Sequence, residues 1–249
     1  MIRQAAILLG AAVVSASLAA PRVLADPPTP PCPQPAYLML HDLPLPLARA
    51  GLAQTKKLGI LTIGGAATEG SAAGDPAFTY PARLQADLIA ALPGIPVTVV
   101  NRARNQRNGA LAPEDLPAVI QESGAKLVIW ATGAREAAGS ADIDAYVARL
   151  EKGIIAIRSA GADLILLDMQ YAPSIARIVN FGPYRDALLG TAAARDVPVL
   201  RRYELMMQWS DGGVMNLDVQ DTAERRQVAR QLFGCIAAAL SPAIAQALK

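Results

Sequence analysis

Short apolar runs of strand length alternate with amphipathic stretches along most of the chain. The apolar runs cover residues 58–64, 96–101, 126–132, 163–169 and 197–201. Amphipathic stretches that predict helices cover residues 81–92, 113–122, 142–159, 184–194 and 221–240. Continuous apolar strands separated by helices are typical of a parallel sheet buried on both faces. The pattern therefore predicts an α/β domain, a three-layer α/β/α sandwich around a five-stranded parallel sheet.

The first 25 residues do not share this alternation. Arg3 precedes an apolar run from residue 5 to residue 20, and small residues end at Ala25, directly before Asp26. This layout is typical of a secretory signal peptide over residues 1–25, and the apolar run is short for a membrane span. We expect a periplasmic or secreted protein with no transmembrane segment after cleavage. The alternative is an uncleaved membrane anchor.

Residues 26–57 connect this leader to the predicted domain. Residues 26–35 read DPPTPPCPQP, a proline-rich tether that fits neither a helix nor a sheet interior. Residues 37–55 are expected to form a strap that ends in a helical turn. The domain itself is expected to occupy residues 58–249.

Composition narrows the functional classes. The chain has 249 residues and is 53% hydrophobic, enough for one sizeable core. Removal of residues 1–25 would leave 21 basic residues (23 minus Arg3 and Arg22) against 21 acidic ones, and aromatic residues make up only 4%. This balance gives no support for nucleic-acid binding.

Cysteine and histidine usage gives no support for a metal site or a cofactor. The single histidine is His41, and no HxxxH or CxxC spacing occurs. The two cysteines, Cys32 and Cys235, are expected to form one disulfide between the tether and the last helix in an oxidising compartment. Two free buried thiols are the alternative.

The carboxyl ends of parallel strands are where such sheets bind ligands. The loop after the first strand, GGAATEG from Gly64 to Gly70, resembles the first conserved block of the SGNH (GDSL-type) hydrolase superfamily. Gly64, Thr68 and Gly70 match that block, but Ala66 stands where the resemblance places the nucleophilic serine. Alanine has no oxygen to attack a carbonyl carbon. A phosphate loop fits less well, because Ser71 rather than lysine follows Gly70.

The next two loops resemble the second and third blocks of the same superfamily. Asn101 and Arg102 match the opening of the second block, while Ala103 replaces a glycine whose N–H helps form the oxyanion hole. In the third block Gly133 matches, whereas Arg135 replaces the oxyanion-binding asparagine and Glu136 the following aspartate. The resemblance implies an SGNH-hydrolase, flavodoxin-like fold.

The last block should supply an aspartate and a histidine, the general base. One alignment, through DGGVMN from residue 211, places Val214 at the histidine. The other, counted back from Cys235, places Glu224 at the aspartate and Gln227 at the histidine, and is preferred because it keeps the cysteine in register. Neither supplies a base. A structural alternative for Glu224 is a role beside an Asp221 cap at the start of the last helix.

The leading hypothesis is therefore a secreted, catalytically inactive pseudo-esterase that retains a pocket for an anionic or acylated small molecule or glycan. Its expected ligand-binding residues are Gly64, Thr68, Glu69, Asn101, Arg104 and Arg135. The arginines are alternatively paired with acids such as Glu69 and Glu136. Two other functions stay open. One is an active ester hydrolase with a rearranged site, using Ser71, Thr68, Glu69 or Glu224, and the other is an envelope protein that binds a partner.

Overall fold

A five-stranded, all-parallel sheet forms the centre of the protein. The computed structural model describes residues 32–104 and 111–249, so the predicted signal peptide and the tether up to residue 31 lie outside the described residues. The strands are β1 (Leu58–Ile63), β2 (Val97–Asn101), β3 (Leu127–Ala131), β4 (Asp163–Leu167) and β5 (Val199–Leu200). Their order is β2-β1-β3-β4-β5, with every pairing parallel. This is the flavodoxin-like order, and it confirms the predicted sheet.

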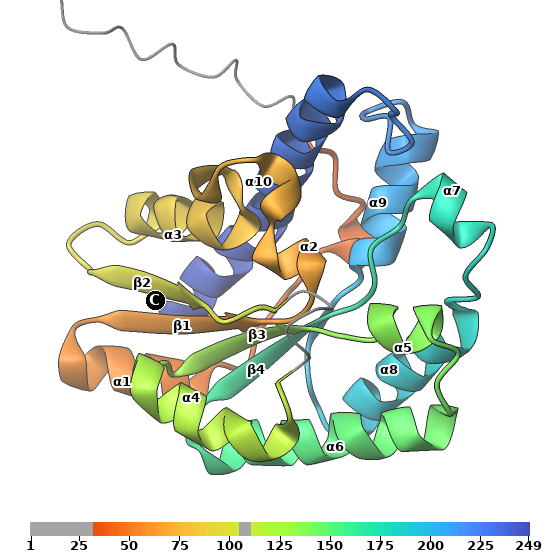
Figure 1. The fold of residues 1–249 in the computed structure, drawn as a ribbon. Coiled ribbons are helices and arrows are strands. Elements are labelled where there is room, and N and C mark those ends of the chain that lie inside the picture. Colours follow the sequence, from red (N-terminus) through yellow and green to blue (C-terminus); the bar gives the residue numbers. More distant parts are fainter. Residues whose placement is uncertain (1–31, 105–110) are drawn as a thin grey trace, which may run out of the picture.

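Helices cover both faces of the sheet (Figure 1). One layer contains α1 (Pro46–Thr55), α3 (Tyr80–Ala91), α9 (Arg202–Asp211) and α10 (Thr222–Leu248). The other contains α4 (Leu116–Ser123), α6 (Ile143–Ser159) and α8 (Gly182–Ala194). Strand side chains alternate between the layers. In β1, Leu58 and Ile60 pack into the first core, and Leu61 and Ile63 into the second. The three-layer sandwich predicted from the apolar runs is confirmed.

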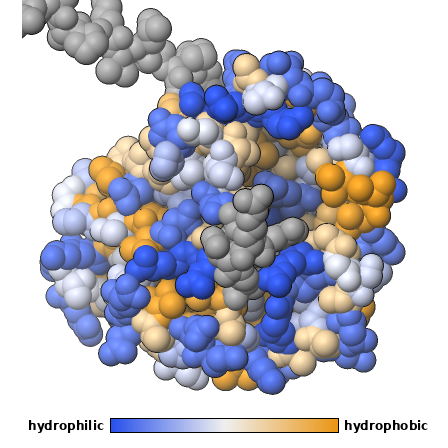
Figure 2. All heavy atoms as spheres, in the orientation of Figure 1, coloured by the Kyte–Doolittle hydropathy of each residue, from blue (hydrophilic) through white to orange (hydrophobic). Residues whose placement is uncertain are grey.

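Short helical segments lie in the loops, several of them near the carboxyl ends of the strands. They are η1 (Ala36–Leu38), α2 (Ala66–Glu69), η2 (Ser71–Ala73), η3 (Pro76–Phe78), η5 (Pro113–Asp115), α5 (Ala134–Ala138) and α7 (Pro173–Ala176). Viewed from the same side, the surface is largely hydrophilic, with a hydrophobic area at the right where α7 lies (Figure 2). Ile175 and Ile178 are exposed there.

The N-terminal strap is more integrated than the sequence indicated. Where a helical turn was expected, α1 is a ten-residue helix, and Ala48 and Leu52 are buried in the first core. The N–H of Ala48 donates to the Asp163 carboxylate at the start of β4, 2.8 Å away. A carboxylate from another element thus satisfies one of the free N–H groups in the first turn of this helix.

The predicted disulfide between Cys32 and Cys235 is present. It joins the end of the tether to α10, and the Trp209 indole N–H donates to the Pro33 carbonyl nearby, at 2.7 Å. Among the described residues, α10 is the one helix long and apolar enough to cross a membrane, but 67% of its most apolar window is buried inside the protein. That burial identifies it as a core helix of this domain.

Candidate ligand-binding cavity

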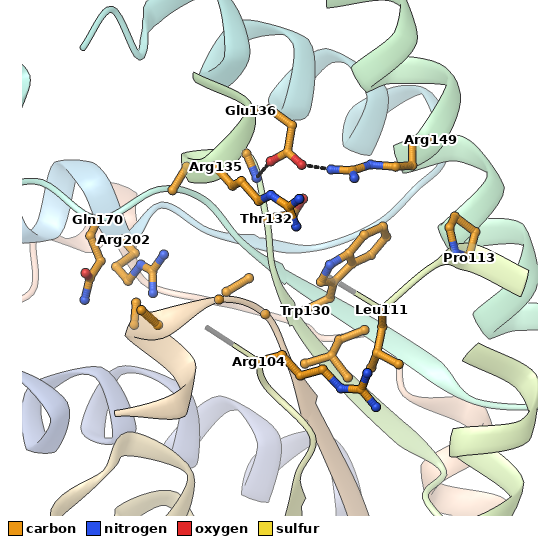
Figure 3. Close-up of a pocket in the computed structure, with 18 of the residues that line it drawn as sticks. Arg104, Leu111, Pro113, Trp130, Thr132, Arg135, Glu136, Arg149, Gln170 and Arg202 are labelled. Atoms are coloured by element: carbon orange, nitrogen blue, oxygen red, sulfur yellow. Dashed lines mark hydrogen bonds and ion pairs between the residues drawn. The ribbon is translucent and has the colours of Figure 1, made fainter. Parts of the chain in front are cut away.

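A cavity of about 250 Å³ opens at the carboxyl ends of the strands. Its walls come from the loops after β1, β2 and β3, from α6, and from the segments after β4 and β5 (Figure 3). The lining residues include Ala66, Arg104, Trp130, Thr132, Arg135, Glu136, Arg149, Gln170 and Arg202. The cavity lies where the topology predicts a ligand site, and it contains several of the expected residues.

The loop after β1 presents a methyl group where the superfamily has its nucleophile. Gly64 and Ala66 both line the cavity. Thr68 is fully buried behind them, with its hydroxyl oxygen 2.7 Å from where a Cβ on Gly64 would lie. Neither Thr68 nor Glu69, both expected to bind ligand, lines the cavity. Ser71, the alternative nucleophile, is exposed and lies outside it too.

The loop after β2 is held by Asn101. The Asn101 amide donates to the Thr68 carbonyl at 2.9 Å, and its oxygen accepts from the Ala103 N–H at 3.0 Å and the Thr62 hydroxyl at 3.2 Å. The N–H of Ala103, at the position of the oxyanion-hole glycine, is therefore already occupied. Asn101 does not line the cavity and joins two loops instead, whereas the Arg104 side chain does line it.

The loop after β3 places a charged pair in the wall. Glu136 is 9% exposed, accepts from the Gly133 N–H at 3.2 Å, and forms an ion pair with Arg149 of α6. The alternative that Glu136 neutralises Arg135 is therefore not what the structure shows. Arg135 is exposed at the cavity, and within residues 32–104 and 111–249 no carboxylate pairs with it.

Arg202 is a cavity residue that the sequence did not single out. It begins α9 directly after β5, is 2% exposed, and donates from Nη2 to the Asp168 carbonyl at 2.5 Å. Its Nε has no hydrogen-bond partner in the described chain. Burial lowers the pKa of the guanidinium, opposed by the nearby Asp168 carboxylate. Its place beyond the end of the last strand was the available signal, but nothing in the sequence predicts that an arginine is buried.

The Asp168 carboxylate lies behind Arg202 in a buried polar cluster. It accepts from the Tyr203 N–H at 2.9 Å and from Arg185 Nε at 3.3 Å. Burial is the largest influence on the pKa of Asp168 and raises it, against the hydrogen bond from Tyr203 and the charges of Arg202 and Arg185. Glu204 accepts from Arg185 at 2.5 Å and from Arg201 at 2.7 Å.

Neither alignment of the last block brings a residue into the cavity. Val214 is partly buried against the first core, and Glu224 and Gln227 are exposed on the first turns of α10. The Asp221 carboxylate caps that helix by accepting from the N–H groups of Ala223 and Glu224, both at 2.9 Å, as the structural alternative proposed. His41 is exposed in the strap, with its ring beside the Ala36 carbonyl.

The described lining of the cavity therefore offers little chemistry for bond cleavage. Its one hydroxyl belongs to Thr132 and its one carboxylate to Glu136, and it holds no serine, cysteine, histidine or lysine. No cluster of three metal-binding side chains occurs in the part of the chain that the structure describes. What the lining does offer is four arginines against one carboxylate. The arrangement suits the binding of an anion.

Comparison with known proteins supports the superfamily assignment. A model of the Non-GDSL lipase-like family matches residues 31–249. The fold is similar to that of TesA, with a TM-score of 0.53, 19% identity, and coverage of 73% of this chain and 99% of TesA. It is also similar to a lipase/acylhydrolase from Enterococcus faecalis, with a TM-score of 0.54, 18% identity, and coverage of 77% and 98%.

A third similar structure is a mutant of Axe2, an acetyl-xylooligosaccharide esterase from Geobacillus Stearmophilus. The TM-score is 0.51 at 18% identity, over 73% of this chain and 94% of that one. No curated protein matches the sequence. At these identities the solved structures establish a shared fold, the SGNH-hydrolase fold expected from the loop motifs, and not a shared activity.

Proposed function

The chain belongs to the Non-GDSL lipase-like family, and from this premise we propose that it is a catalytically inactive pseudo-esterase whose cavity binds a small anionic or acylated molecule. The observation that carries the proposal is the cavity lining. Where the fold would place a nucleophile there is the methyl group of Ala66, and no described lining residue is a histidine. Acyl transfer needs an activated nucleophile, which this lining does not supply.

The rearranged hydrolase has less support. Of its candidate residues, Ser71 and Glu224 lie outside the cavity, and Thr68 is buried behind it. The Thr132 hydroxyl does line the cavity, but the only carboxylate there, Glu136, is engaged by Arg149 and the Gly133 N–H.

Binding is favoured by charge and by size. The lining carries Arg104, Arg135, Arg149 and Arg202 against Glu136, and arginine is well suited to carboxylate and phosphate groups. The cavity volume of about 250 Å³ lies just below the usual range for drug-sized ligands. A small molecule, or one end of a larger acylated molecule or glycan, fits such a volume.

A periplasmic or secreted location is part of the same proposal. The leader-like pattern of residues 1–25 and the disulfide between Cys32 and Cys235 support it, since disulfides persist in oxidising compartments. Fractionation of cells that express the full chain tests it. Recovery of the protein in the cytoplasm with the leader intact would contradict it.

The proposal is tested by hydrolysis of p-nitrophenyl acetate and butyrate. We expect no rate above buffer for the wild type, and none for Ala66→Ser, because a restored serine would lack a base. Thr132→Ala is the matched variant for the remaining hydroxyl. Wild-type turnover that is lost in Thr132→Ala would establish an active hydrolase and overturn the proposal.

A further inference from the structure

A group of charged side chains lies behind one end of the cavity, and two of its members, Asp168 and Arg202, are buried. It consists of Asp168, Arg185, Arg201, Arg202 and Glu204, which contact one another through hydrogen bonds and ion pairs. Three cations face two carboxylates, which leaves 3 − 2 = +1. Buried charges are normally paired, because an isolated one is costly to remove from water. The Arg201 side chain is 39% exposed, so its charge is shared with water and the surplus of the group is not a buried one.

Arg202 is the buried arginine of this group, and it makes no ion pair with a carboxylate in the described chain. Arg185 and Arg201 both bind the Glu204 carboxylate, and Arg185 also binds that of Asp168. Arg202 instead donates to a neutral backbone carbonyl and keeps Nε without a partner in the described chain, although it is 2% exposed. Nearby Tyr80 does not supply the missing charge, since burial raises the pKa of its hydroxyl to about 12. Arg202 lines the cavity, so an anion bound there would lie beside its guanidinium.

The opposite end of the cavity has an apolar wall. Leu111, Pro113, Leu116 and Trp130 line it. Figure 3 shows Trp130, Leu111 and Pro113 together on one side, with the Arg104 guanidinium beside Leu111. Arg202 and Gln170 lie on the other side, and Arg135 reaches in between. The indole of Trp130 is held against α6, where a Cβ on Gly153 would lie 2.4 Å from the ring. This wall is therefore a preformed apolar surface rather than a loose side chain.

From this division we propose that the ligand is a small amphiphilic carboxylate, with its anionic end at Arg202 and Arg135 and its apolar body against Trp130. The inference rests on the proposed function and names the ligand class for the same cavity. Arg202 and Arg135 both line the cavity and neither makes an ion pair in the described chain, which suits one anionic group between them. A body of about five or six carbons suits the small volume, and each methylene moved out of water against the apolar wall strengthens binding.

Calorimetric titration with four probes tests separately whether the ligand's negative charge and its apolar body contribute to binding. Hexanoate supplies both, hexanamide keeps the body without the charge, and acetate keeps the charge without the body. Inorganic phosphate tests a small anion of another class. We expect hexanoate to bind at least about tenfold more tightly than each of the other three, the size of effect usual for one charged hydrogen-bonding group.

Substitutions of single arginines show where hexanoate binds. Arg202→Gln is expected to weaken hexanoate binding by about tenfold or more, and Arg135→Gln by about three- to tenfold. Arg102→Gln is the matched control, since Arg102 is also exposed but pairs with Glu122 at 2.6 Å and does not line the cavity. Circular dichroism reports whether Arg202→Gln folds. If it does not, the comparison of Arg135→Gln with Arg102→Gln decides.

The outcomes separate this inference from the proposed function. If hexanamide bound as tightly as hexanoate, the proposed site for the anionic group would be wrong. If acetate bound as tightly as hexanoate, the proposed apolar contact would be wrong. In both cases the proposal of an inactive ligand-binding cavity would still stand. No heat with any probe, or equal losses in Arg135→Gln and Arg102→Gln, would overturn the site itself. Selective hexanoate binding by a protein that hydrolyses p-nitrophenyl butyrate would instead support the site while refuting catalytic inactivity.

Discussion

Among single residues, three positions that match the superfamily blocks have clear structural roles. Gly133 has φ of 91°, and a Cβ there would lie 2.0 Å from Met169 Cε. Gly70 has φ of 81°, and its Cβ would lie 2.5 Å from the Thr79 side chain. Asn101 joins two loops by three hydrogen bonds. Ala66 and Arg135, where the chemistry should be, have no such constraint. This contrast fits the proposal that the loops keep the architecture of the superfamily without its reactive groups.

A pair of glycine variants tests this distinction. Gly133→Ala should lower the free energy of unfolding by about 2 kcal/mol or more, because it combines an unfavourable positive φ with overpacking. Gly65→Ala is the control, since Gly65 has a negative φ and nothing within 4 Å of its added Cβ. Urea denaturation measures both. Equal effects of the two substitutions would show that the close approach at Gly133 is not a constraint.

Among the helices and strands, hydrophobic periodicity predicted the strands that are buried on both faces of the sheet. It missed elements whose burial depends on tertiary contacts. The five strands read as continuous apolar runs, and the long amphipathic helices followed. Helix α9 was not predicted, although Leu205, Met206 and Trp209 are buried, because it begins with Arg202 and its burial relies on the Asp168 carbonyl. For the same reason, motif matching placed only some of the expected ligand-binding residues correctly. Gly64, Arg104 and Arg135 line the cavity, whereas Thr68, Glu69 and Asn101 do not.

The start of α10 gives a pH-dependent prediction. Hydrogen bonds from the backbone N–H groups, that of Glu224 first, lower the pKa of Asp221 below its usual 3.8. A carboxyl whose pKa is lowered on folding stabilises the protein above the unfolded pKa, and this contribution is lost as pH falls through the folded value. The difference in melting temperature between wild type and Asp221→Ala should therefore hold from neutral pH to about pH 5 and narrow below about pH 4.

Asp221→Asn serves as the control for that series. Asparagine caps a helix about as well as aspartate without a titrating charge, so its difference from Asp221→Ala should not narrow with acid. A wild-type advantage over Asp221→Ala that is unchanged at about pH 3 would mean that ionisation of Asp221 contributes nothing to the cap.

At the scale of the whole molecule, the N-terminal segment is closed onto the domain rather than trailing from it. The disulfide joins Cys32 to Cys235 across a sequence separation of 203, Leu45 and Ala48 are buried in the first core, and Arg49 donates to the Ala247 carbonyl at 2.9 Å. The chain from the end of the tether to the last helix therefore folds as one unit, consistent with a family match that begins at residue 31.

Reduction of the disulfide should lower the stability of the protein. On the chain-entropy account, a loop of this length contributes about 5 kcal/mol to the free energy of unfolding, so reduction with dithiothreitol should lower the denaturation midpoint markedly. The variant with Cys32→Ala and Cys235→Ala should start from the lower midpoint and be insensitive to reductant. A wild-type midpoint that reductant leaves unchanged would contradict a stabilising role for the disulfide.

One proton NMR experiment on the purified protein, with ethyl hexanoate and hexanoate together, tests whether the cavity binds a ligand without cleaving an ester. Saturation transfer reports which molecule contacts the protein, and the ester signal reports hydrolysis in the same tube. We predict saturation transfer to hexanoate, reduced in Arg135→Gln, and an ester signal that stays constant over hours. Steady loss of the ester signal relative to a protein-free sample would contradict the account.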